Sequence, residues 1–160
     1  MTKIESILCR LTHRLRVALA ASAAERVLPV YRANYDADTD VFQAALDLVW
    51  EYAAGGGVEP QDLRTLHAAA AARIPSVDID VEFIPAMNAG VTVLYALDSI
   101  TDTGYQSVFS ALLSDIEAAT SFAADADQAE RRELRWLDKA LKLAQKWNDK
   151  PIKRGMFANP

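Results

Sequence analysis

Two pairs of carboxylates, each spaced four residues apart, are the side chains best placed to share a cation. Asp47 and Glu51 form one pair, and Asp98 and Asp102 form the other. Residues at this spacing lie on one face of a helix, so both carboxylates can reach the same ion. A solvated helix face produces the same spacing more often, and neither pair has a third ligand beside it. We therefore predict no metal ion and no cofactor.

The aspartates at 36, 38 and 40 resemble the opening of a calcium-binding loop. Such a loop needs glycine at its sixth position and a bidentate glutamate at its twelfth. The sequence has Val41 and Asp47 at those positions. The apolar period of a helix has already begun at Val41, so these aspartates are expected to cap that helix.

Histidine and cysteine offer no recognisable catalytic or zinc motif. His13 and His67 lie on different predicted helices, and neither has a ligand-spaced partner. Cys9, the only cysteine, lies among apolar residues, which predicts a buried and inert thiol. No nucleophile elbow, P-loop or dinucleotide fingerprint is present. The sequence therefore predicts no catalytic residues.

The helix predicted over residues 83–100 is apolar nearly all round, which is typical of a buried helix. It is too short and too interrupted by polar residues to span a membrane. The apolar spacing predicts other helices over residues 4–22, 41–52, 60–74, 105–123 and 134–147. Pro29 is expected to kink or end the first of them near Val27. The fold class is all-α, a single compact bundle of six or seven helices around the central helix.

Residues 1–150 are predicted to form this one domain, and residues 151–160, which have no apolar period, a loosely ordered tail. Between the third helix and the central helix, apolar residues alternate strictly with Asp78, Asp80 and Glu82. A period of two is typical of a strand, yet the chain offers no second strand for pairing. We predict an extended connector that presents these three acids on one face.

Charge is segregated along the 160 residues, whose formal net charge is −5. Residues 36–127 contain sixteen acidic and two basic residues, whereas both flanking segments are basic. The last helix carries a basic stripe of Arg135, Lys139, Lys142 and Lys146. Nucleic acid is an unfavoured partner, because the chain is acidic overall and the stripe lacks interleaved aromatic residues. Charged residues break the apolar runs of the N-terminus, so we expect no signal peptide and a cytoplasmic location.

Several short blocks, in order over roughly residues 20–144, resemble the YjaG-like bacterial family, a domain-of-unknown-function family. These blocks are Glu25-Arg26 with Pro29 and Tyr31, the helix segment Leu46-Asp47-Leu48-Val49-Trp50-Glu51, Ile74-Pro75-Ser76, and Pro85-Ala86. The resemblance implies an all-helical fold and a small bacterial cytoplasmic protein. It implies no activity.

Two hypotheses about function follow. The first is a non-enzymatic acidic binding protein of the immunity or antitoxin type, which neutralises a basic toxin by direct binding. Its expected partner-binding residues are Asp47, Glu51, Asp78, Asp80 and Glu82. The alternative is an enzyme or a small-ligand-binding domain with a site near Asp47, Trp50 and Glu51. We expect no membrane partner, and a homo-oligomer is compatible with the sequence.

Overall fold

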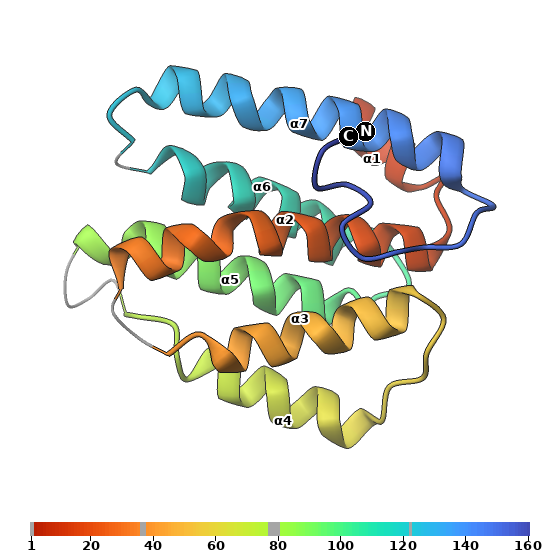
Figure 1. Cartoon of the computed structure of the whole chain (residues 1–160), viewed down its shortest axis with the longest axis horizontal. Coiled ribbons are helices and arrows are strands. Elements are labelled where there is room, and N and C mark those ends of the chain that lie inside the picture. Colours follow the sequence, from red (N-terminus) through yellow and green to blue (C-terminus); the bar gives the residue numbers. More distant parts are fainter. Residues whose placement is uncertain (1, 36–37, 77–80, 122) are drawn as a thin grey trace.

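A computed structural model describes residues 2–35, 38–76, 81–121 and 123–160 of the chain. The described residues contain seven α-helices and one short 3₁₀ helix (Figure 1). In chain order they are α1 (Lys3–Leu8), α2 (His13–Asn34), α3 (Asp40–Ala53), α4 (Pro60–Ala71), η1 (Val81–Phe83), α5 (Ile84–Asp98), α6 (Gln106–Thr120) and α7 (Ala126–Trp147). The prediction of an all-α bundle is therefore confirmed.

Helices α2 and α5 lie side by side at the centre of the bundle. Helix α6 packs against both of them, and α7 covers α6 along one edge. On the other side, α3 packs against α2 and α5, and α4 forms the opposite edge against α3 and α5 (Figure 1). The two outermost helices, α4 and α7, are thus separated by the core.

Helix α5 is the predicted core helix, and its face toward α2 and α6 is fully buried. Val93 and Leu97 have no exposed surface, whereas Leu94 is only partly buried. Gly90 permits a close approach of the chain after α4, because a Cβ atom at this position would lie 2.8 Å from Cγ1 of Ile74. Leu97 is therefore fully enclosed in the core, whereas Leu94 keeps a side that faces solvent.

The N-terminal segment differs from the single helix predicted there. Helix α1 ends at Leu8, and α2 begins at His13. A capping box at Thr2 and Glu5 stabilises the start of the short first helix. Pro29 does not end the helix near Val27, because α2 continues through it to Asn34. The proline ring is exposed, and burial of twelve other residues of α2 offsets the lost helical hydrogen bond.

The connector and the tail also differ from the sequence-based expectations. The part of the connector that is described, Val81–Phe83, forms the 3₁₀ helix η1 instead of an extended segment, and residues 77–80 lie outside the described residues. The tail packs against the bundle. Phe157 is 0% exposed, and its carbonyl accepts a hydrogen bond of 2.8 Å from Nε1 of Trp136. A buried aromatic side chain anchors the tail to α7.

Candidate functional site

The predicted pair Asp47 and Glu51 lies on the exposed face of α3. The opposite face of this helix is buried because its apolar residues recur at helical spacing. Asp62 enters from α4, and the three carboxylate side chains line one hollow of about 380 Å³. Its remaining lining is Ala44, Leu48, Thr65 and Leu66. The α3–α4 hollow, as we call it, therefore combines negative charge with exposed aliphatic surface.

The three carboxylates of the α3–α4 hollow differ in their partners. Oδ1 of Asp47 accepts hydrogen bonds from Nη1 of Arg154 at 2.6 Å and from Nε2 of Gln43 at 3.1 Å. The bond from Arg154 is the largest cause that lowers the pKa of Asp47. The side chains of Glu51 and Asp62 have no ion-pair or hydrogen-bond partner among the described residues. Two of the three negative charges are therefore free to meet a basic partner.

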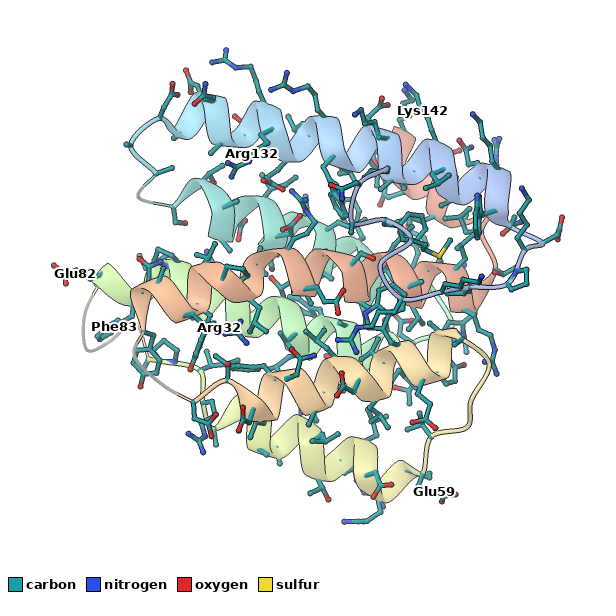
Figure 2. All side chains as sticks on the ribbon, in the orientation of Figure 1. Arg32, Glu59, Glu82, Phe83, Arg132 and Lys142 are labelled. Atoms are coloured by element: carbon teal, nitrogen blue, oxygen red, sulfur yellow. The ribbon has the colours of Figure 1, made fainter. Side chains whose placement is uncertain are left out.

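The other predicted acidic residues do not join this hollow in the described structure. Glu82 is exposed in η1 and projects from one end of the molecule (Figure 2). Glu59, which precedes α4 and is close to Asp62 in sequence, lies near the opposite end in the same view. Asp78 and Asp80 lie outside the described residues. The structure thus brings together Asp47 and Glu51 and places Glu82 elsewhere.

Trp50, which the alternative hypothesis placed with these acids, belongs to the core. Only 4% of its surface is exposed, and it is absent from the lining of the α3–α4 hollow. Its indole Nε1 is buried without a hydrogen-bond partner among the described residues. A ligand in the hollow would contact Asp47 and Glu51 but not the indole ring.

A second hollow, between α4 and α5, was missed by sequence reasoning. Nε2 of His67 lies 3.1 Å from Oδ1 of Asp98, and this pair lines a space of about 440 Å³. Arg64 is its other charged lining residue, and Leu63 and Ile100 contribute to its apolar walls. His67 and Asp98 are far apart in sequence, so no local spacing indicates that they pair. The hollow combines apolar walls with a few polar groups, as small-ligand sites do.

The second carboxylate pair does not converge on an ion. Asp102 accepts backbone hydrogen bonds from Ser107 at 2.8 Å and from Gly104 at 2.9 Å, and the bond from Ser107 is the largest cause that lowers its pKa. It therefore satisfies amides around the start of α6. Asp98 instead faces His67. Within the described ranges, no group of three His, Cys, Asp or Glu residues is arranged to hold a metal ion.

Side-chain exposure bears on Cys9 and on the basic stripe of the last helix. Cys9 is exposed, so the prediction of a buried thiol is wrong. The reason is local, since α1 ends at Leu8 and the next side chain no longer lies on its buried face. The basic stripe of α7 is exposed at all four of its positions, and Lys142 projects outward from the helix (Figure 2). No helix in the described part of the chain is long and apolar enough to cross a membrane.

Residues of the YjaG-like blocks make contacts that hold the bundle together. Arg154 of the tail bonds Oε1 of Glu25 at 2.7 Å as well as Asp47, and so links α2 to α3. The hydroxyl of Tyr31 donates a hydrogen bond of 2.6 Å to the carbonyl of Arg73. Pro85 lies in the first turn of α5, where its missing N–H costs nothing. These block residues have structural roles here.

Comparisons with known proteins identify a similar fold. No protein-family profile and no curated protein matches the sequence. Among solved structures, the chain is similar to a DUF416 family protein from Shewanella baltica OS155. The TM-score is 0.78 at 16% sequence identity, and the match covers 99% of this chain and 91% of the other. The two proteins share a fold, and the name DUF416 denotes a domain of unknown function. The YjaG-like affiliation stays a prediction.

Proposed function

We propose that this protein is a non-enzymatic binding module whose acidic edge, formed by α3 and α4, holds a basic protein segment. The observation that carries the proposal is the α3–α4 hollow, where Glu51 and Asp62 are exposed beside aliphatic side chains. A helical segment with lysine or arginine beside apolar residues has the matching chemistry. Its apolar side chains would cover Leu48 and Leu66, and its cations would meet the two carboxylates.

The distribution of charge over the fold supports this choice of partner. Residues 40–71, which include α3 and α4, contain five acidic residues and one basic residue. Residues 131–147, the part of α7 that follows its first turn, contain six basic and two acidic residues. The two segments occupy opposite edges of the bundle (Figure 1). A basic partner is therefore steered toward the α3–α4 edge and away from α7, and association slows as salt rises.

In its finer form, the proposal is an immunity protein of the YjaG-like type that neutralises a basic toxin in the bacterial cytoplasm. Direct binding of this kind needs a rigid acidic surface and no catalytic group. The helical scaffold supplies such a surface, and the unpaired Glu51 and Asp62 supply its charge. The cognate partner would be a basic domain encoded by the adjacent gene.

The test compares two charge-reversal variants for binding to that domain. In the first, Glu51→Lys and Asp62→Lys reverse the charge of the hollow but leave the bond between Asp47 and Arg154 intact. In the control, Asp127→Lys and Glu130→Lys make the same change of charge at exposed positions of α7. Association and dissociation rates are measured by surface plasmon resonance at several salt concentrations.

We expect the first variant to associate at least tenfold more slowly at low salt and to lose most of its salt dependence. The control should stay close to wild type. Equal rates for wild type and the first variant, with the helical circular dichroism unchanged, would refute the α3–α4 hollow as the docking surface. Absence of binding by the wild type would refute the immunity role.

A second candidate function, small-ligand binding, is favoured by the hollow between α4 and α5. Its apolar walls suit an aromatic or aliphatic body, and Arg64 and His67 suit a carboxylate on that body. Benzoate titrated into labelled protein should shift the amide resonances around His67 and Asp98 in a saturable manner. His67→Ala should abolish those shifts, and no saturable shift in the wild type would reject this candidate.

A further inference from the structure

A third hollow lies where α2, α7 and the tail meet. It has a volume of about 420 Å³ and is lined by Trp136, residues 158–160 and four cationic side chains. These cations are Arg26 of α2 and Arg132, Arg135 and Lys139 of α7. No carboxylate side chain is part of this lining. We call it the cationic hollow.

Two of the four cations are held in place by a buried carboxylate. Glu133 is 3% exposed and uses both of its oxygens. Oε2 accepts a hydrogen bond from Nη2 of Arg26, and Oε1 accepts one of 3.0 Å from Nε of Arg132. The guanidinium of Arg26 also stacks on the ring of Trp136, with its Cζ 4.4 Å from the ring centroid. The two guanidinium groups are therefore fixed on one carboxylate before any ligand arrives, which lowers the entropic cost of binding.

The tail completes the hollow from the other side. Nε1 of Trp136 donates a hydrogen bond to the carbonyl of Phe157, whose side chain is fully buried. These contacts fix residues 158–160 beside the arginines and set the tail as one wall of the hollow. The site is thus built from three segments that are distant in sequence, and it is more than a basic helix face.

The positive charge in the hollow is not balanced by the protein. Glu133 is the one carboxylate bonded to these cations among the described residues. Asp115 is near enough for Arg26 and Arg132 to act on its ionisation, but burial raises its pKa to about 8, so it is mostly neutral at pH 7. Lys139 has no partner in the described part of the chain, and Arg135 bonds a backbone carbonyl through Nε alone. The four cationic side chains of the lining share one bonded carboxylate side chain, so the side chains of the hollow leave an excess of positive charge.

We propose that the cationic hollow binds the phosphate group of a small phosphorylated molecule. A guanidinium presents a planar fork of N–H donors that matches two oxygens of a phosphate, and a lysine adds a mobile point charge. Bound phosphate would relieve the repulsion among the four cations. This inference concerns a different edge of the molecule from the proposed protein-binding surface, so either can fail without the other.

The test uses inorganic phosphate and pyrophosphate as probes with the full chain. Binding is measured by isothermal titration calorimetry in a chloride buffer at pH 7 and constant ionic strength. The test variant is Arg135→Gln with Lys139→Gln, because neither residue bonds Glu133 and the fold should be retained. The control is Lys142→Gln with Lys146→Gln, which removes the same charge from the same helix outside the lining of the hollow.

We expect saturable binding by the wild type and a loss of affinity of about tenfold or more in the test variant. The affinity of the control should change by less than about twofold, because only long-range charge is lost. Glu133→Gln should also weaken binding, since its neutral amide no longer holds both guanidinium groups. Equal losses in the test and control variants would show a diffuse electrostatic effect and overturn the proposal. Lack of saturable binding by the wild type would also overturn it.

A single-stranded oligonucleotide provides a further arm of the experiment. If the ligand is a small phosphate compound, pyrophosphate should displace the oligonucleotide from the cationic hollow but not from the rest of α7. The control variant should then lose affinity for the oligonucleotide and keep its affinity for pyrophosphate. Oligonucleotide binding that weakens equally in both variants, without any pyrophosphate binding, would assign α7 to nucleic acid and reject the phosphate site.

Discussion

The pH dependence of folding stability should be dominated by a single buried carboxyl group, that of Asp115. This residue of α6 is 1% exposed, and its Oδ1 has no hydrogen-bond partner among the described residues. Burial is the main cause that raises its pKa to about 8, and the negative charge of Glu133 adds to the effect. The substitution Asp115→Asn keeps the shape of the side chain and removes its ionisation.

The sign and size of the effect follow from the raised pKa. Between about pH 4 and pH 8 the folded protein keeps a proton on Asp115 that the unfolded chain has released. The stability from this group is therefore fully present below about pH 4 and is lost as the pH rises toward 8. Each pH unit in this window costs about 1.4 kcal/mol. From pH 5 to pH 8 the wild type should lose about 4 kcal/mol relative to Asp115→Asn.

The free energy of unfolding is measured by urea denaturation of both proteins at pH 5, 6, 7 and 8. The amide of the variant adds an offset that does not depend on pH, so the change in the difference between the proteins reports Asp115 alone. Asp138→Asn is the control, because the bond from Lys142 lowers the pKa of Asp138 and leaves this carboxyl ionised throughout the range. A difference between wild type and Asp115→Asn that stays constant with pH would refute the reasoning.

Three other predictions concern packing and metal binding. Leu97→Ala should lower the free energy of unfolding by about 2–5 kcal/mol. Leu94→Ala, on the partly exposed side of α5, should lower it by only about 1–2 kcal/mol. Equal losses in urea denaturation would contradict the buried and exposed faces assigned to this helix. Phe157→Ala should cost about 3–5 kcal/mol, and a cost below about 1 kcal/mol would mean that the tail does not anchor in solution. EDTA should leave the melting temperature unchanged, and a clear decrease would reveal a metal bound to the folded state.

Local signals in the sequence determined the helical fold class and several boundaries. The helix predicted over residues 41–52 is α3, which spans Asp40–Ala53, and α4 begins at Pro60 as predicted. Helix α5 could be identified as the core helix because a helix without a wide polar face must be enclosed by others. The shared helix face of Asp47 and Glu51 was also predictable, because it depends only on the helical repeat.

Only the tertiary structure decided which distant residues meet. The pairs Arg26–Glu133 and His67–Asp98 join different helices. Pairing at such separations depends on how the helices are arranged in the bundle, and no sequence period encodes that arrangement. The tail shows the same limit, because residues 151–160 have no apolar period, yet Phe157 is fully buried and its carbonyl accepts a hydrogen bond from Trp136 of α7. Both the cationic hollow and the partial neutralisation of Asp47 by Arg154 depend on that packing, and so neither could be read from the spacing of residues along the chain.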